Sequence, residues 1–94
     1  MLKVRSLSIT KEALDFIQLL EPKQFKQVLK KVLGLLAEPT PIDASSLKGY
    51  NDLFRADIGE YRVVYKFDEQ TVSVLIVDRR NDDEVYKKRS RKNI

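Results

Sequence analysis

Four arginines are the residues of this chain best suited to chemistry, because they lie in or beside segments that read as neighbouring β-strands: Arg55, Arg62, Arg79 and Arg80. The chain has no cysteine and no histidine, which excludes thiolate nucleophiles, cysteine–zinc sites and imidazole acid–base catalysis. A guanidinium donates paired hydrogen bonds to a phosphate, so arginines gathered on one sheet would form a cradle for a phosphodiester. Tyr86 follows the Arg79-Arg80 pair, where it could stack on a base or contact a phosphate.

The same arginines also have a purely structural interpretation. Arg62 projects from a strand whose other face carries aromatic core residues, and an arginine inside a sheet needs a partner or a ligand because burying its charge unpaired is costly. Asp57 and Asp78 are the candidate salt-bridge partners. The residues alone leave both interpretations open.

The N-terminal half must supply the helices that support such a sheet. A short strand is expected over residues 2–7, followed by a helix over 11–20 that Thr10 caps. Pro22 suits the first position of a second helix, and the break before it favours an antiparallel helical hairpin. The second helix shows an apolar stripe at helical spacing: Phe25, Val28, Leu29, Val32, Leu35 and Leu36. Prolines then open a linker that runs to about residue 51.

The C-terminal half reads as a strand meander over residues 53–58, 61–67 and 71–78. Gly59-Glu60 suits a two-residue type II′ turn between the first two strands, and the third strand is apolar on both faces and should be central. Asn81 and Glu84 resemble a capping box before a short basic helix. The acids of that first turn suit the helix dipole better than a metal ion, so no metal site is expected.

These elements predict an α+β fold in the order β-α-α-β-β-β-α, in which a small antiparallel sheet carries the helical hairpin and the short basic C-terminal helix. Residues 1–94 are expected to form a single domain, because the chain is too short for two. There is no apolar run long enough to span a bilayer and no signal-peptide pattern, so the expected protein is soluble and cytoplasmic, with no membrane contact.

The net charge of +4 is unevenly placed. Five of the 18 basic residues lie after Tyr86 with no acid among them: Lys87, Lys88, Arg89, Arg91 and Lys92. A clustered basic segment suggests a polyanion or an acidic protein as partner, although a solvated C-terminus would look the same.

Several motifs, in their order and spacing, resemble the RelE/ParE toxin superfamily and most closely its RelE-like branch. They are Leu47-Lys48-Gly49, Leu53-Phe54-Arg55, Ile58-Gly59-Glu60-Tyr61-Arg62-Val63-Val64-Tyr65, Val77-Asp78-Arg79-Arg80-Asn81 and Glu84-Val85-Tyr86. The resemblance covers nearly the whole chain, including the two N-terminal helices.

The resemblance implies the toxin of a type II toxin–antitoxin system. RelE-like members are mRNA interferases that cut mRNA in the ribosomal A site to inhibit translation. In this metal-independent and cofactor-free endoribonuclease reaction, the 2′-hydroxyl attacks the adjacent phosphate and leaves a 2′,3′-cyclic phosphate and a free 5′-hydroxyl. The alternative is a ParE-like toxin that inhibits DNA gyrase without being an enzyme.

The resemblance also implies residue roles. Arg62 would bind the scissile phosphate, Arg80 would stabilise and protonate the leaving group, and Tyr86 would orient or stack on the nucleotide. Arg55 would contact a phosphate or help to activate the 2′-hydroxyl. Further RNA contacts would come from Lys48, Arg79, Lys87 and Lys88. Replacing Arg62 or Arg80 by alanine is expected to abolish toxicity and to leave the fold intact.

One residue departs from the family pattern. Asp57 stands at a position that is basic in the family if Arg55 fills the first basic position. A carboxylate there is competent as a general base but would also repel an RNA phosphate, so the proton acceptor stays unassigned. The implied partners are a cognate antitoxin, mRNA and the ribosome with its rRNA, with a monomeric toxin inside a toxin–antitoxin hetero-oligomer.

Overall fold

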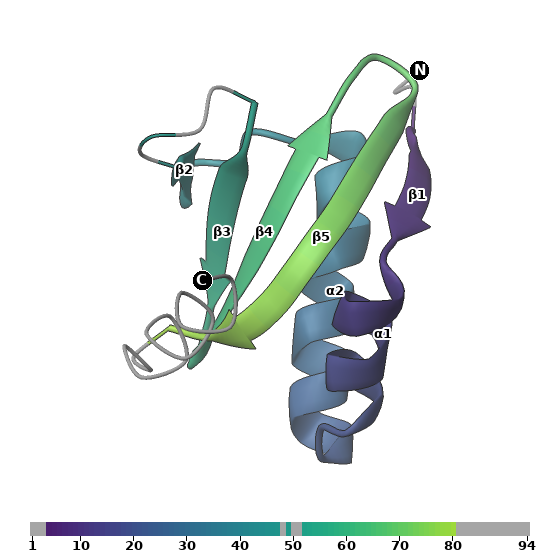
Figure 1. Ribbon diagram of the computed structural model, residues 1–94, viewed down its shortest axis with the longest axis vertical. Coiled ribbons are helices and arrows are strands. Elements are labelled where there is room, and N and C mark those ends of the chain that lie inside the picture. Colours follow the sequence, from purple (N-terminus) through teal and green to yellow (C-terminus); the bar gives the residue numbers. More distant parts are fainter. Residues whose placement is uncertain (1–3, 48, 50–51, 81–94) are drawn as a thin grey trace, which may run out of the picture.

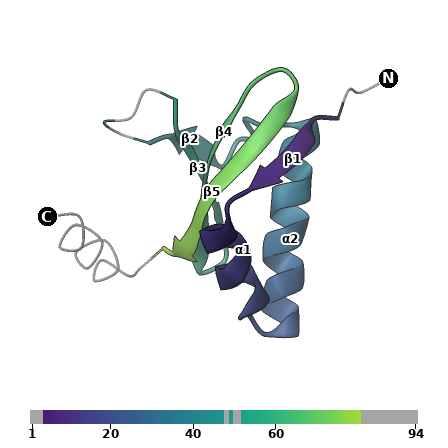
Figure 2. The ribbon, with the colours of Figure 1, turned by 45° about the vertical axis from the view of Figure 1, so that its right-hand side comes forward.

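The computed structural model, described over residues 4–47, 49 and 52–80, is a five-stranded sheet with two helices packed on one of its faces (Figures 1 and 2). The strand order is β1-β5-β4-β3-β2. β1 runs parallel to β5, and the other neighbouring strands are antiparallel. The elements are β1 (Ser6–Ile9), α1 (Lys11–Gln18), α2 (Pro22–Ala37), β2 (Ala44–Ser46), β3 (Phe54–Ile58), β4 (Tyr61–Phe67) and β5 (Thr71–Arg79). The predicted α+β fold is confirmed, and β5 is an interior strand as expected. The sheet is mixed and not antiparallel throughout as predicted, because the N-terminal strand β1 pairs in parallel with β5.

Both helices begin where the sequence predicts. The Thr10 hydroxyl accepts a hydrogen bond from the Ala13 N–H at 3.1 Å and so caps α1, and Pro22 occupies the first turn of α2. Of the predicted apolar stripe of α2, the fully buried members are Val28, Val32 and Leu35. Phe25, in the first turn of α2, stays partly exposed.

The hydrophobic core lies between these helices and the inner face of the sheet. From the helices it includes Ala13, Ile17, Val28, Val32 and Leu35, and from the sheet Ala56, Tyr61, Val63, Tyr65, Val72, Val74 and Val77. In β4 the odd-numbered residues face the helices, as the predicted alternation requires.

The β3–β4 connection is the predicted two-residue hairpin. Ile58 pairs with Tyr61, and Gly59 has a positive φ of 56°. No non-glycine residue of the described chain has a positive φ, so only the first turn position needs glycine, as in a type II′ turn.

Two boundaries in the sheet differ from expectation. The N-terminal strand is Ser6–Ile9 instead of residues 2–7, because its pairing with β5 starts at Ser6 opposite Thr71, where β5 itself begins. The expected linker contains a fifth strand, β2, whose residues Ala44, Ser45 and Ser46 pair with β3 despite their weak strand preference. The predicted C-terminal helix and its capping box lie outside the described residues.

The linker after α2 is fixed to both layers. The buried Tyr65 hydroxyl donates to the Pro39 carbonyl, and Lys31 of α2 forms an ion pair with Asp43. Burial, with the nearby carboxylates of Asp43 and Glu38, raises the pKa of Tyr65 to about 12. The Lys31 ammonium in turn holds the pKa of Asp43 below its usual value. These contacts place the linker beside α2 and the edge of the sheet.

None of the helices in the described part of the chain has the length and apolar character needed to cross a membrane. The same residues include no cluster of three or more acidic side chains arranged to hold a metal ion.

Candidate functional site

A β-bulge in β5 decides which side chains share a face with Arg62. Val64 of β4 pairs with Ile76, whereas the next residue, Tyr65, pairs with Val74, so Leu75 is an extra residue in β5. Before the bulge, Val72 and Val74 point into the core; after it, Val77 does. A regular strand would send residue 78 into the core with residues 72 and 74, so the bulge turns Asp78 to the face away from the helices.

Thr10 holds this bulge from outside the strand. Its backbone N–H donates to the Val74 carbonyl at 3.0 Å, and its hydroxyl donates to the carbonyl of the bulge residue Leu75 at 2.7 Å. The same hydroxyl oxygen caps α1. One side chain therefore joins the start of the first helix to the irregularity that orients the end of β5.

Beyond the bulge, arginines and aspartates alternate across three strands. Asp57 of β3 and Asp78 of β5 are the cross-strand neighbours of Arg62 in β4. Arg55 lies two residues from Asp57 along β3, opposite Val64, and therefore on the same face. We call this surface the arginine face; its members are Arg55, Asp57, Arg62, Asp78 and Arg80.

Arg62 is the buried member of the arginine face. Its Nε lies 3.1 Å from Asp78 Oδ1, and both residues are 5% exposed. Asp78 is thus the salt-bridge partner of Arg62, as the structural interpretation of the sequence predicted. A phosphate that approaches Arg62 must therefore compete with a carboxylate that already neutralises it.

Arg80 is the accessible member. Its side chain is 48% exposed, its Nη1 donates to the Gly59 carbonyl at 3.1 Å, and its Nε lies 3.6 Å from Asp57 Oδ2. Its backbone N–H also donates to the Glu60 carbonyl at 2.8 Å. The β3–β4 turn thus presents the Arg80 guanidinium, while Asp57 makes only a long ion pair with it.

Arg79 does not join this group. It pairs with Tyr61, whose ring is in the core, so the alternation of β5 directs Arg79 to the helix-covered side at the end of the sheet, where it is exposed. Arg79 and Arg80, although consecutive, therefore lie on opposite faces of the sheet. The other predicted site residues lie outside the described chain: Tyr86, Lys48, Lys87 and Lys88.

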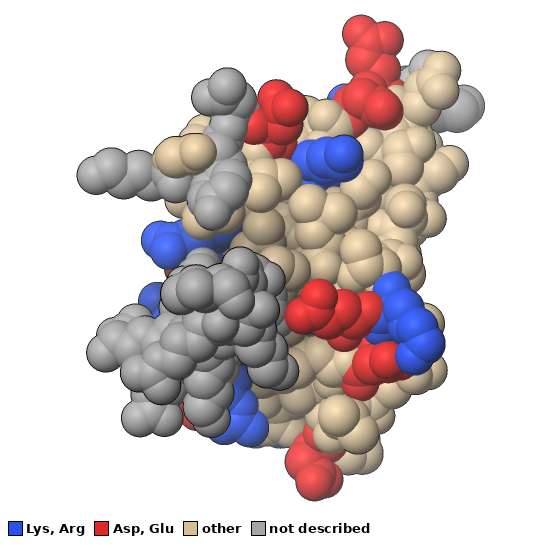
Figure 3. All heavy atoms as spheres, in the orientation of Figure 1, with Lys and Arg blue, Asp and Glu red and all other residues tan. Residues whose placement is uncertain are grey.

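On the face shown in Figure 3, atoms of Lys and Arg lie among atoms of Asp and Glu instead of forming one continuous positive surface. What the arrangement offers a ligand is one accessible guanidinium at the turn, a half-buried arginine at position 55 and a buried, carboxylate-paired arginine between them.

Sequence reasoning found the arginines and both aspartates but missed Thr10 as a support of the site. Its role at the helix start was visible in the sequence, whereas its contact with Leu75 spans 65 residues and depends on the bulge. No local pattern signals that contact.

Comparison with known proteins decides the family. Residues 5–84 match the family described as the ParE toxin of type II toxin–antitoxin systems, parDE. The chain belongs to this toxin family. It is thus a type II toxin of the RelE/ParE superfamily, as the sequence motifs indicated. No curated protein sequence matches it.

Solved structures of RelE toxins share its fold. The RelE–RelB complex of Pyrococcus horikoshii aligns with a TM-score of 0.73 and 26% identity over 85% of this chain and 99% of that one. The RelBE2 toxin–antitoxin complex of Mycobacterium tuberculosis gives 0.72 and 27%, over 83% and 100% of the two chains. The isolated Escherichia coli RelE toxin gives 0.70 and 26%, over 96% and 99%.

Proposed function

We propose that this toxin is an mRNA interferase that cuts mRNA in the ribosomal A site. The observation that carries the proposal is the gathering of Arg55, Arg62 and Arg80 on the sheet face away from the helices. With the carboxylates of Asp57 and Asp78, the three guanidinium groups leave this face a net positive charge that complements a phosphodiester, and preorganised positive groups stabilise the charge that develops on a phosphorane.

In the proposed reaction the substrate supplies its own nucleophile. The ribose 2′-oxygen attacks the adjacent phosphorus, the bond from phosphorus to the 5′-oxygen breaks, and the products are a 2′,3′-cyclic phosphate and a 5′-hydroxyl. The proton of the 2′-hydroxyl goes to a base and the leaving 5′-oxygen gains a proton, so the reaction needs no metal or cofactor. Arg80 is the proposed group at the leaving oxygen because it is the exposed arginine of the face.

Arg62 and Arg55 receive roles that fit their surroundings. Arg62 is the proposed contact of the scissile phosphate, with Asp78 holding its guanidinium in a fixed orientation. Arg55 is the proposed second phosphate contact. Arg79 is proposed as an RNA contact outside the reacting centre, because it lies on the other side of the sheet. The proposed roles of Tyr86, Lys48, Lys87 and Lys88 concern residues beyond the described chain.

One observation favours a second candidate, a ParE-like toxin that inhibits DNA gyrase without cutting RNA. Both described arginines with proposed roles at the breaking bond already face a carboxylate: Arg62 faces Asp78 and Arg80 faces Asp57. A non-enzymatic toxin would have no need to release either arginine.

Mapping of mRNA ends after induction separates the two candidates. Primer extension in cells expressing the parent toxin should show cuts within codons, and Arg80→Ala should remove them. Lys11→Ala removes the same charge from an exposed residue of α1, which has no proposed role in RNA binding, so it should keep the cutting. Growth arrest with intact mRNA and an SOS response would reject the nuclease in favour of gyrase inhibition.

A further inference from the structure

Asp57 is the carboxylate of the arginine face that a substrate can reach. Its side chain is 29% exposed, whereas that of Asp78 is 7% exposed and accepts a hydrogen bond from the Arg62 guanidinium. The register of β3 and β4 places Asp57 directly opposite Arg62, the proposed contact of the scissile phosphate. The 2′-hydroxyl that attacks this phosphate is next to it in the substrate, and therefore lies close to Asp57.

The Asp57 carboxylate is held loosely enough to accept a proton. Among the described residues it makes one ion pair, in which Asp57 Oδ2 lies 3.6 Å from Arg80 Nε, a separation longer than a hydrogen bond. Its two oxygens receive no hydrogen bond from the part of the chain that the structure describes. Asp57 can therefore take up a proton without losing a hydrogen bond, whereas Asp78 would have to release Arg62.

Few other side chains of this protein could accept that proton. The sequence has no histidine and no cysteine, and an arginine keeps its proton in a folded protein. Within the arginine face this leaves the two carboxylates, and Asp78 is both buried and paired. Of the described residues on this face, Asp57 is thus the one whose exposure and surroundings suit a base.

A proton on Asp57 would also change the charge of the face at the step where the substrate's charge changes. Three guanidinium groups and two carboxylates give the face a net charge of +1, which balances the single negative charge of a phosphodiester. The phosphorane carries one negative charge more. When Asp57 becomes neutral, the face gains one positive charge, so it binds the transition state more strongly than the substrate.

We propose that Asp57 is the general base of the cleavage reaction. The assignment rests on the proposed function and names the proton acceptor that the sequence left open. The proton of the 2′-hydroxyl passes to the Asp57 carboxylate while the bond from the 2′-oxygen to phosphorus forms. The bond from phosphorus to the 5′-oxygen then breaks, the 5′-oxygen takes a proton from water, and Asp57 returns its proton to water.

The contacts of Arg80 are compatible with a base beside it. Its Nε faces Asp57 and its Nη1 donates to the Gly59 carbonyl. The third nitrogen, Nη2, makes no hydrogen bond within the described part of the chain. Nη2 is therefore the donor that can stabilise the charge on the departing 5′-oxygen while Asp57 holds the proton of the 2′-hydroxyl.

Single-turnover cleavage of mRNA on programmed ribosomes tests the assignment. Asp57→Asn keeps the shape of the side chain and removes its basicity, so cleavage should slow at least about hundredfold. RNA binding should not weaken, because a negative charge beside the phosphate is lost. The melting temperature should change little, since the ion pair with Arg80 is partly exposed. Asp15→Asn, the same change on α1, should cleave like the parent.

The pH dependence of the rate distinguishes a base from a residue that only positions Arg80. The parent rate should fall at acidic pH, where Asp57 is protonated, and this decrease should be absent in Asp57→Asn. Formate added to Asp57→Ala should restore part of the rate by supplying a carboxylate. A folded Asp57→Asn variant that cleaves at the parental rate overturns the proposal. So does a slow variant that keeps the acidic decrease, because the proton acceptor then lies elsewhere.

The outcome is separable from that of the proposed function. If the parent cuts mRNA and Asp57→Asn cuts it equally well, the nuclease stands and Asp57 is not its base. If the parent cuts no mRNA, the nuclease and the assignment of its base are both rejected.

Discussion

The buried Arg62–Asp78 pair makes these two residues structural whatever else they do. Both side chains are almost fully buried, and removing one partner leaves an uncompensated charge in a region of low polarity. We therefore expect Arg62→Ala to lower the free energy of unfolding by about 3–5 kcal/mol. This differs from the expectation, based on sequence alone, that the variant keeps the parent's stability. Chemical denaturation of the purified protein measures it.

A double variant distinguishes this pair from simple loss of packing. Arg62→Met combined with Asp78→Leu removes both charges, and it should recover much of the stability lost in either single variant. Additive losses would show that the two side chains act independently. Loss of toxicity in Arg62→Ala can be assigned to chemistry only in cells where the variant is shown to be folded.

Asp57 is expected to restrain the arginine face. Its carboxylate lies 3.6 Å from Arg80 and would stand close to any phosphate bound there. Asp57→Asn should tighten binding of a short RNA about two- to fivefold, the size expected for an exposed ion pair. Fluorescence anisotropy at several salt concentrations measures the change. Asp15→Asn, which removes the same charge from α1, should have no effect. Faster cleavage by Asp57→Asn would agree with restraint, whereas abolished cleavage would identify Asp57 as the proton acceptor.

Tyr65 gives the fold a specific alkaline limit. Its pKa is raised from 10.0 to about 12, so the folded state holds the phenolic proton more tightly than the unfolded state does. The stability linked to this proton is complete below pH 10 and is lost as the pH rises toward 12. Tyr65→Phe should cost about 1–2 kcal/mol at neutral pH, because the Pro39 carbonyl loses its donor. The stability difference between parent and variant should shrink above pH 10; a constant difference would contradict the assignment.

At the scale of elements, the bulge and the start of α1 form one unit. Thr10→Val keeps the shape of the side chain but removes the hydroxyl that caps α1 and binds the Leu75 carbonyl. We expect a loss of about 1–2 kcal/mol in stability and altered amide chemical shifts at Leu75 and Ile76. Thr10→Ser retains the hydroxyl and should resemble the parent. Unchanged shifts in a destabilised Thr10→Val variant would limit the role of Thr10 to the helix cap.

The elements that local signals specify were predicted correctly. Thr10, Pro22 and the apolar stripe place the two helices, and Gly59 places the hairpin, because each acts through neighbours in the chain. The short strand β2 could not be predicted, since residues 44–46 become a strand only by pairing with β3. The helices and the hairpin therefore form through local interactions, whereas β2 forms only through its tertiary pairing with β3.

The arrangement of the site was predictable only in part. Asp57 and Asp78 were recognised as candidate partners for the arginines, but the register that brings Asp78 to Arg62 depends on the extra residue at Leu75. Strict alternation counted from Val72 would bury Asp78 and Arg80 among core residues. A bulge within a continuous apolar run has no signature in the sequence, so the pairing of Arg62 with Asp78 could not be predicted from it.

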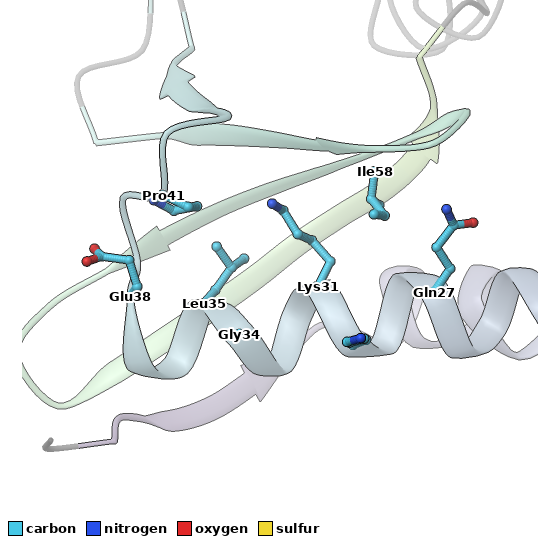
Figure 4. A pocket seen from close by; sticks show the side chains of 8 residues that line it. Gln27, Lys31, Gly34, Leu35, Glu38, Pro41 and Ile58 are labelled. Carbon is cyan, nitrogen blue, oxygen red and sulfur yellow. The ribbon is translucent and has the colours of Figure 1, made fainter.

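For the whole molecule, the sheet separates two surfaces that meet at one turn. The arginine face lies on one side and the two helices on the other. At the turn, a β-carbon on Gly59 would lie 3.1 Å from Gln27 Nε2, so Gln27 of α2, labelled in Figure 4, packs against the glycine whose carbonyl receives the Arg80 hydrogen bond. Away from this turn, a change of charge on the helix side should leave toxicity unaffected.

Growth assays test whether toxicity depends on the arginine face alone. Arg80→Ala should permit growth, because the accessible guanidinium of that face is lost. Lys11→Ala removes the same charge from α1, on the helix side of the sheet, and should arrest growth as the parent does. Growth arrest by a folded Arg80→Ala variant would mean that toxicity does not need the accessible guanidinium.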